Sequence, residues 1–133
     1  MKVSVITPFY HGNEYMSDYE TMMDANEKRL DEGDFMEVII VNDSPDEAVQ
    51  LSGIYNSRAN WKVFVNKKNT GIHASRIRGA KESTGDYLIF LDQDDEISND
   101  AIASFLKEAK RIAPSGICYK VIVADRKSTR LNS

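Results

Sequence analysis

Three aspartates stand close together directly after a run of apolar and aromatic residues. Asp92, Asp94 and Asp95 follow the segment YLIFL at residues 87–91, in the order DQDD. Because carboxylates repel one another and resist burial, packing alone does not account for three of them at this point. A divalent cation would neutralise them, and carboxylate oxygens are common ligands of Mg²⁺ and Mn²⁺. The spacing therefore favours a divalent-metal site at the end of a buried strand.

The acidic cluster also allows a structural interpretation, in which it caps the helix expected from Asp100. An EF-hand loop is excluded, because counting from Asp92 the sixth position is Ile97 instead of Gly and the twelfth is Ala103 instead of Glu. An aspartyl phosphotransferase motif, Asp-x-Asp-x-Thr, is unsupported, since Glu96 stands where Thr is required. Metal binding and helix capping both stay open from the residues alone.

Polar and aromatic residues also follow the three other strands that the sequence predicts before this one. They are Thr7, Pro8, Phe9 and Tyr10, then Asn42 and Asp43, then residues 66–71. Open α/β sheets bind ligands at the carboxyl ends of their strands, where these residues would gather. A nucleotide-sugar needs a carboxylate for its base, cations or a metal for its diphosphate and an aromatic wall, and Asp43, Arg76 and Tyr10 are of these types. The chain has no Gly-x-x-x-x-Gly-Lys-Ser/Thr phosphate loop, which favours a bound metal as the holder of a diphosphate.

Strands and helices alternate along the chain. Apolar runs predict strands at residues 3–7, 37–41, 61–65, 87–91 and 117–123, and helical periodicity predicts helices at residues 14–30, 45–55, 71–83 and 100–112. Asn13 is expected to cap the first helix, Pro45 to open the second and Pro8 to close the first strand. Asp43 could equally cap the helix after Pro45. The order predicts an α/β fold, a Rossmann-like, mostly parallel sheet with helices on both faces.

Composition fits one small domain, because 133 residues with 41% hydrophobic side chains build a single core. A net charge of -4 gives no basic footprint for nucleic acid, so no nucleic-acid partner is expected. Cys118 is the only cysteine, which excludes an internal disulfide and favours a reducing compartment. No apolar run approaches the roughly 20 residues of a membrane span. We expect a cytoplasmic location, with membrane association left open for a full-length parent.

The last nine residues, DRKSTRLNS at 125–133, abandon the alternating pattern. They resemble the peptide that a common sequencing-adapter DNA encodes. We therefore expect residues 1–124 to be an incomplete nucleotide-sugar-binding domain and residues 125–133 to be a non-native tail. An ordinary polar C-terminal tail is the alternative.

Three ordered segments resemble the N-terminal, donor-binding half of the family 2 inverting glycosyltransferases, which have a GT-A fold. They are VSVITPFY at residues 3–10, EVIIVNDSPDE at residues 37–47 and NTGIHASRIRGAKESTGDYLIFLDQDD at residues 69–95. The last segment is the most specific, since it carries Asn-x-Gly, Arg, Gly, Gly-x-Tyr and Phe-Leu-Asp-x-Asp-Asp in the family's order. The family commonly has Asp-Asp-Gly-Ser after its second strand, and the Asn-Asp-Ser-Pro of this chain keeps Asp43 in place.

The resemblance implies roles for the matching residues. The nucleotide-sugar site would contain Thr7, Pro8, Phe9, Tyr10, Asp43, Asn69, Gly71, Arg76, Asp92 and Gln93. Within it, Asp43 would bind the base, Asp92 would contact the ribose, and Asp94 would coordinate Mn²⁺ or Mg²⁺ at the phosphates. No catalytic residue is assigned, because the family's catalytic base lies beyond the part of the pattern that this chain matches.

The resemblance also implies an activity. A full-length parent would transfer a sugar with inversion from a nucleotide-sugar, with a UDP-sugar as the expected donor, to a glycan or lipid-linked acceptor. The present chain, without the family's base and acceptor region, is expected to be inactive. A non-catalytic nucleotide-binding or interaction module of the same fold is the alternative.

Overall fold

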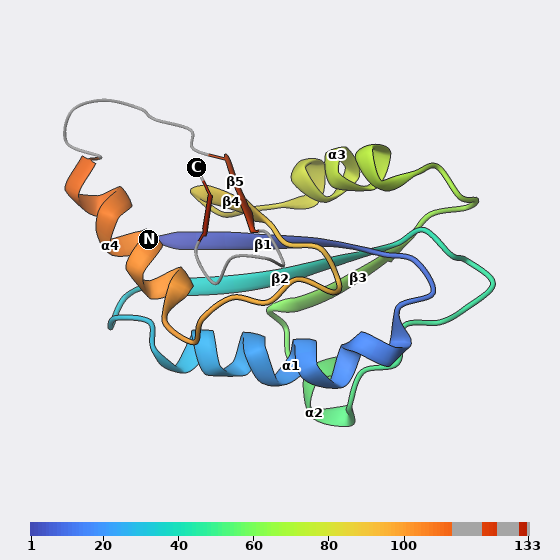
Figure 1. The fold of residues 1–133 in the computed structure, drawn as a ribbon, viewed down its shortest axis with the longest axis horizontal. Coiled ribbons are helices and arrows are strands. Elements are labelled where there is room, and N and C mark those ends of the chain that lie inside the picture. Colours follow the sequence, from blue (N-terminus) through green and yellow to red (C-terminus); the bar gives the residue numbers. More distant parts are fainter. Residues whose placement is uncertain (113–120, 125–130, 133) are drawn as a thin grey trace.

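The computed structural model describes residues 1–112, 121–124 and 131–132, which form one sheet with its flanking helices (Figure 1). The elements are β1 (Lys2–Phe9), α1 (Asn13–Lys28), β2 (Phe35–Asn42), α2 (Gly53–Asn56), β3 (Trp61–Val65), α3 (Ile72–Glu82), β4 (Tyr87–Phe90), α4 (Ala101–Ile112), β5 (Val121–Ala124) and β6 (Leu131–Asn132). The expected alternation of strands and helices is confirmed, and β3 has the predicted bounds.

The strands lie in the order β3-β2-β1-β4-β5-β6. All neighbours from β3 to β5 pair in parallel, and only β6 runs antiparallel to β5. The chain first builds outward from β1 to β2 and β3, and then crosses to the other side of β1 to form β4. The direction of sheet growth therefore reverses between β1 and β4, which is the position where open α/β sheets bind ligands.

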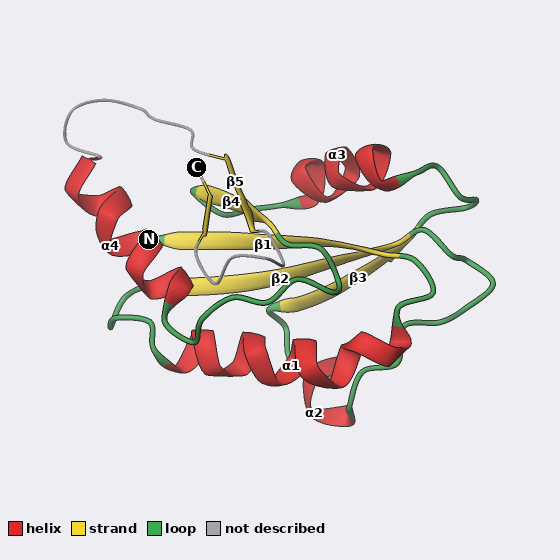
Figure 2. Cartoon of the chain, in the orientation of Figure 1, coloured by secondary structure: helices red, strands yellow, loops and turns green. Residues whose placement is uncertain are grey.

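Helices cover both faces of the sheet, as predicted (Figure 2). On one face, α1 and α4 bury side chains such as Met16, Met23 and Leu106 against the apolar residues of β1 and β2. On the other face, α3 packs so closely that a Cβ at Gly79 would lie 2.4 Å from the side chain of Ile6. The two apolar layers fix the sheet between the helices, and the strand ends emerge at its edge.

Asn26 of α1 holds the segment that leads from β4 into α4. This asparagine is fully buried. Its side-chain amide donates to the carbonyl of Ser98 at 3.2 Å and accepts from the backbone N–H of Ile102 at 3.2 Å. Because the first N–H groups of a helix lack partners within the helix, this contact anchors the start of α4. The acidic residues between β4 and α4 are thereby tied to the core.

Three local predictions were wrong. Asn13 lies inside α1, which Gly12 precedes without a side-chain cap, because the Asn13 amide instead bonds to the backbone of Ala48 and Gln50. The helix expected at 45–55 is reduced to Gly53–Asn56, since the Asn42 side chain accepts from Ser44 and donates to Glu47, which favours a turn.

The third error concerns Pro8, which does not close β1. The strand continues to Phe9, with Pro8 still in register with Val41 of β2. The pairing of β1 with β4 ends at Ile6. At Pro8, the side of β1 that faces β4 therefore has no partner strand. A proline is tolerated at such an edge because no partner strand requires its missing N–H.

The C-terminal predictions are only partly within the described residues. The strand expected at 117–123 overlaps β5, and residues 117–120, including Cys118, lie outside them. β6 falls within the predicted tail and pairs with β5 through two residues. The non-native character of residues 125–133 and the end of the domain at residue 124 stay predictions.

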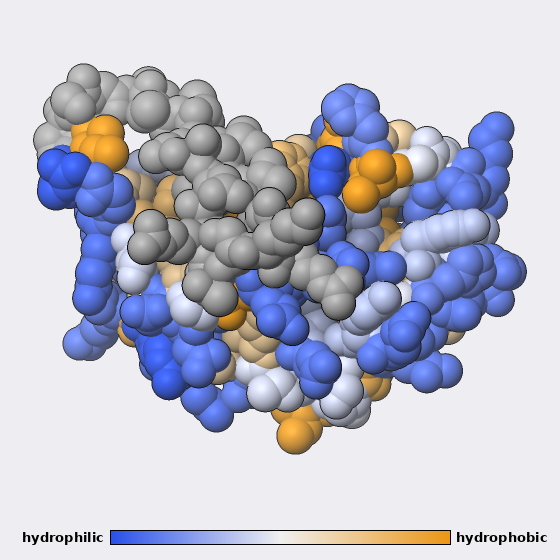
Figure 3. Space-filling view, in the orientation of Figure 1, coloured by the Kyte–Doolittle hydropathy of each residue, from blue (hydrophilic) through white to orange (hydrophobic). Residues whose placement is uncertain are grey.

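The surface is mainly hydrophilic in the view of Figure 3, with hydrophobic side chains gathered beside α3. Ile72 and Ile77 of α3 are both exposed. None of the helices in the described part of the chain has the length and apolar character to span a membrane.

Candidate functional site

A cleft of about 360 Å³ opens at the carboxyl end of the sheet, where β1 and β4 diverge. It is lined by Pro8, Phe9, Tyr10, Asp43, Asn69, Gly71, Ile72, Asp92, Gln93 and Asp94. All the predicted site residues except Thr7 and Arg76 therefore meet in one place. They come from the ends of β1, β2 and β4 and from the loop before α3, so that the topology alone brings these four segments together.

Asp43 is the most deeply held carboxylate in the cleft. Its Oδ1 accepts hydrogen bonds from Asn66 Nδ2 at 2.8 Å and from the Thr70 backbone N–H at 2.8 Å, and its Oδ2 accepts from the Gly71 N–H at 2.8 Å. Burial would raise the pKa of Asp43, but the hydrogen bonds from Thr70, Asn66 and Gly71 outweigh it and lower the pKa below its ordinary value. Asp43 is thus a charged acceptor at neutral pH.

Asp43 caps a different helix from the one that the sequence suggested. It does not cap a helix after Pro45, because no helix begins there. Instead it accepts N–H groups directly before Ile72, the first residue of α3, where backbone donors are unpaired and the helix dipole favours a negative charge. Gly71 supplies the positive φ of 93° that this turn requires.

Arg76 and Asp92 contact each other at the edge of the cleft. Arg76 Nη2 donates to Asp92 Oδ1 at 2.8 Å, with both side chains about one-third exposed. The buried Nε of Arg76 has no hydrogen-bond partner among the described residues. This guanidinium therefore orients Asp92 through its Nη2.

Thr7 lies away from the cleft. Its side chain is fully buried, and its hydroxyl is 2.7 Å from the hydroxyl of Tyr19 on the α1 face of the sheet. Because side chains alternate between the two faces of a strand, Thr7 and Phe9 lie on the same side of β1, and the Phe9 side chain is fully buried in the core beside α1 as well. The structure does not bring Thr7 to the predicted base pocket.

The three aspartates of the acidic cluster have different surroundings. Asp95 is buried, and its carboxylate accepts the backbone N–H of Asp92 at 3.0 Å, which closes a turn after β4. Asp94 lines the cleft beside Asp92. Within the described residues, no three His, Cys, Asp or Glu side chains come together as a ready-made metal site. Any metal here would need ligands from a bound molecule as well.

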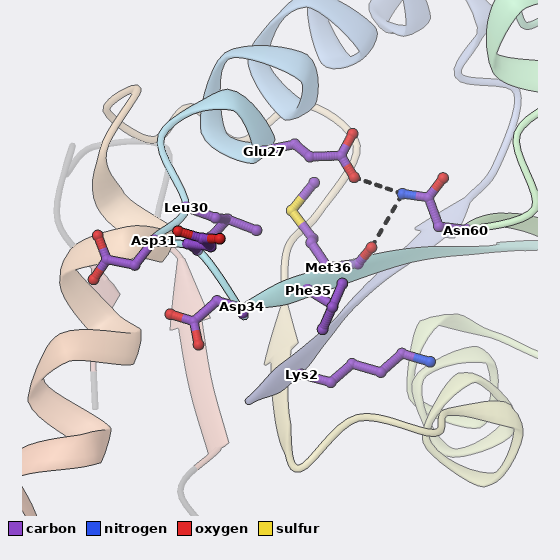
Figure 4. A pocket seen from close by; sticks show the side chains of 10 residues that line it. Lys2, Glu27, Leu30, Asp31, Asp34, Phe35, Met36 and Asn60 are labelled. Carbon is purple, nitrogen blue, oxygen red and sulfur yellow. Dashed lines mark hydrogen bonds between the residues drawn. The ribbon is translucent and has the colours of Figure 1, made fainter.

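A second, larger cleft of about 670 Å³ opens at the opposite, amino end of the sheet (Figure 4). Two of its carboxylates are engaged by the protein: Asp34 pairs with Lys110 and the N-terminal amino group, and Glu27 accepts from Asn60. The amino ends of parallel strands are not where α/β sheets place their ligand sites. We therefore assign the functional site to the smaller cleft at the carboxyl end.

Three residues outside the predicted nucleotide-sugar site shape the cleft. Asn66 donates to Asp43 and accepts from Arg78 Nη1 at 2.8 Å. Gly12 leaves room for the side chain of Gln93. A polar residue directly after a strand was a signal for Asn66, but nothing local in the sequence distinguishes Arg78 or Gly12.

The family model for glycosyl transferase family 2 matches residues 4–132 of this chain. The chain belongs to glycosyl transferase family 2. This finding confirms the family suggested by the three sequence segments, and it agrees with the parallel sheet and the cleft between β1 and β4.

Two curated relatives illustrate the similarity. The sequence is 28% identical over 123 residues to a cholesterol galactosyltransferase of Borreliella burgdorferi, covering 92% of this chain and 33% of that protein. It is 32% identical over 98 residues to the uncharacterized glycosyltransferase YibD of Escherichia coli K12, covering 72% of this chain and 27% of that protein. The chain thus spans about a third or less of the length of these relatives.

Solved structures of Staphylococcus aureus TarS have the same fold. The structure of TarS residues 1–349 in complex with UDP matches with a TM-score of 0.69 and 25% identity over 84% of this chain and 32% of that one. A complex of the same TarS segment with UDP-GlcNAc matches with a TM-score of 0.64 and 27% identity over 86% of this chain. These neighbours support the GT-A fold.

Proposed function

We propose that this chain is the donor-binding part of a glycosyltransferase and that its cleft binds a nucleoside diphosphate sugar, with UDP as the nucleotide. The observation that carries the proposal is the cleft at the reversal point of the sheet, which Asp43, Asp92 and Asp94 line together with the exposed Tyr10 that follows β1. The complexes of TarS with UDP and UDP-GlcNAc, two ligands of a structurally similar protein, support this choice of ligand.

The charge and position of Asp43 suit it to base recognition. An ionised carboxylate accepts hydrogen bonds only, so it selects a base edge that carries an N–H, as uracil does. Tyr10, which is exposed at the cleft, would form the aromatic wall beside the ring, whereas the predicted second wall residue, Phe9, is fully buried in the core. Asp92, oriented by Arg76, would accept from a ribose hydroxyl. Each of these contacts positions the nucleotide without moving a proton.

A divalent metal fits this set of residues. Mg²⁺ is usually held by one or two carboxylates together with the phosphate oxygens of a substrate, so a complete protein cage is not required. Asp94 lines the cleft beside Asp92 and would hold Mn²⁺ or Mg²⁺ there. When bound, the metal would act as a Lewis acid that stabilises charge on the diphosphate.

The full-length parent would transfer the sugar with inversion to a glycan or lipid-linked acceptor. That reaction needs a general base for the acceptor hydroxyl, and no residue of this chain is assigned to that role. We therefore propose that the chain binds the donor without transferring its sugar. An assay of purified chain with UDP-sugars and candidate acceptors should detect no transfer above that of a heat-inactivated sample.

Calorimetry with UDP, GDP, dTDP and CDP, each with Mn²⁺ or with EDTA, tests the binding proposal. We expect UDP to bind in Mn²⁺ and to lose at least about tenfold in affinity in EDTA, because a metal held by Asp94 would neutralise the charge of the diphosphate. The Asp94→Asn variant should bind UDP equally weakly under both conditions. Equal affinity of the unaltered chain with and without metal would exclude the metal role.

A non-catalytic nucleotide-binding or interaction module remains the second candidate function. It shares the fold and the cleft. Joining the present sequence to its native continuation separates the two, since only a glycosyltransferase would then transfer sugar.

A further inference from the structure

The Gln93 side chain links the two strands that border the cleft. Its Oε1 accepts the backbone N–H of Tyr10 at 3.0 Å, and its Nε2 donates to the Tyr10 carbonyl at 3.1 Å. One side-chain amide thus satisfies both backbone groups of one residue. This arrangement imitates the hydrogen bonding of a neighbouring strand.

The location of this contact gives it a specific structural role. The ladder between β1 and β4 ends with the pair Ile6 and Phe90, after which the two chains separate to form the cleft. Gln93 joins them again at Tyr10, beyond the end of the ladder. Because Gln93 stands between Asp92 and Asp94 in the sequence, fixing it restrains the backbone of both acidic residues.

Gly12 makes the contact possible. A Cβ at this position would lie 2.0 Å from Gln93 Oε1 and 2.5 Å from Gln93 Cδ. The backbone of Gly12, with φ of -105°, is one that other residues readily adopt, so its conformation does not require glycine. The missing side chain instead provides the space in which the Gln93 amide reaches Tyr10.

The loop between β1 and α1 is held from a second side as well. His11 has a φ of 45°, an uncommon conformation for a residue with a side chain. Its backbone N–H donates to Ser44 Oγ at 3.1 Å, which ties the loop to the end of β2. Such strained backbone persists where surrounding contacts determine it, and it concentrates at functional sites.

We infer that Gln93 is a positioning residue: its paired hydrogen bonds to Tyr10, accommodated by Gly12, set the separation between Tyr10 and the aspartates of the cleft. This inference rests on the proposed nucleotide binding, and it replaces the expected direct contact between Gln93 and the nucleotide. The pair of hydrogen bonds is called the Gln93–Tyr10 clamp below.

Two substitutions break the clamp from opposite sides. Gln93→Met removes the amide and keeps a side chain of similar length, whereas Gly12→Ala displaces the amide without altering Gln93. If the clamp holds the cleft in its binding-competent conformation, loss of the clamp lowers the population of that conformation. A variant in which this population is about a tenth binds UDP about tenfold more weakly. We expect about this loss in each single variant and no further loss in the double variant, because both changes remove the same contact.

Matched controls are available in the chain. Gln50→Met alters the other glutamine, which is exposed, and Gly53→Ala adds a Cβ that meets no atom within 4 Å. Both should bind UDP as the unaltered chain does. If Gln93→Met weakens UDP binding while Gly12→Ala leaves it unchanged, Gln93 contacts the nucleotide directly and the inference is wrong.

Amide hydrogen exchange provides a readout that does not depend on nucleotide. The Tyr10 N–H should be protected in the 133-residue chain and should lose protection in both single variants, with the amides of α3 unaffected. Rapid exchange at Tyr10 in the unaltered chain would overturn the clamp itself. Absence of UDP binding by the unaltered chain would instead overturn the proposed function, so the two failures are distinguishable.

Discussion

Two buried carboxylates, one near each end of β2, hold the two ends of α3. Glu37, near the start of β2, accepts the N–H of Thr84 at 2.6 Å, just after α3 ends. Asp43, directly after β2, accepts the N–H of Gly71, just before α3 begins. The two groups have the same chemistry and the same helix to anchor, but they lie at opposite ends of the sheet.

The difference between them is the source of their hydrogen bonds. Glu37 accepts from Ser4 and from the ammonium of Lys62 at 3.1 Å, so its charge is paired within the protein. The donors that reach Asp43 come from Asn66, Thr70 and Gly71 and are all neutral. Asp43 also lines the cleft, whereas Glu37 is 1% exposed. A carboxylate that is enclosed and ion-paired stabilises the fold. A carboxylate that lines a cleft and is held only by neutral donors keeps its charge for a ligand.

The largest expected effect is on stability and follows from Glu37. Glu37→Leu leaves the Ser4 hydroxyl and the Thr84 N–H unsatisfied and Lys62 unpaired, so the free energy of unfolding should fall by about 3 kcal/mol. Urea denaturation measures this, with the exposed Glu82→Leu on α3 as the control, which should change stability by less than about 0.5 kcal/mol. The folded fraction of the Glu37 variant should still bind UDP normally.

Asp43→Asn should affect binding more than stability. The N–H₂ group of the introduced amide would then face the backbone N–H of Thr70 or Gly71. The free energy of unfolding should therefore fall by about 1 to 2 kcal/mol. The affinity for UDP should fall about 10-fold to 100-fold, because the acceptor for the base is altered. If calorimetry gives unchanged UDP affinity while denaturation shows the loss of stability, Asp43 is a structural group like Glu37 and the comparison fails.

The pH dependence of stability should separate Glu37 from the other carboxylates. Burial would raise the pKa of Glu37, but the hydrogen bonds from Ser4, Thr84 and Lys62 outweigh it and lower the pKa from 4.5 to about 2. A carboxyl with a lowered pKa stabilises the fold above its unfolded pKa and loses that contribution as the pH falls through its folded pKa. Between about pH 5 and pH 2, Glu37→Gln should therefore lose less stability than the unaltered chain, as measured by denaturation at each pH. Equal slopes would contradict the lowered pKa.

The smallest expected effect compares two asparagines at the ends of β3. Asn66→Leu removes one of the donors to Asp43 and should weaken UDP binding about fivefold, the equivalent of one hydrogen bond of about 1 kcal/mol. Asn60→Leu, at the other end, removes contacts to Glu27 and to the Met36 carbonyl and should leave UDP affinity unchanged. Similar UDP affinities of the two variants would show that Asn66 does not act through Asp43.

The sequence by itself determined the order of the elements and the edge of the sheet that carries the site. Apolar runs and helical periodicity are local patterns, and they gave β3 and α4 closely. The carboxyl ends of parallel strands must share one edge, so Asp43 and Asp92 could be placed near each other without coordinates. Errors arose where a side chain competed for backbone groups, as Asn42 does in the turn after β2.

Only the tertiary structure decided what each polar side chain contacts. Tyr10 and Gln93 are 83 residues apart, and Asp43 and Gly71 are 28 apart, so no local pattern specifies their hydrogen bonds. The family resemblance placed Gln93 in the nucleotide-sugar site, and only the fold shows that its amide bonds to Tyr10. A polar group bonds to whatever donor or acceptor the packed chain brings within about 3 Å, and that geometry exists only after the sheet has formed.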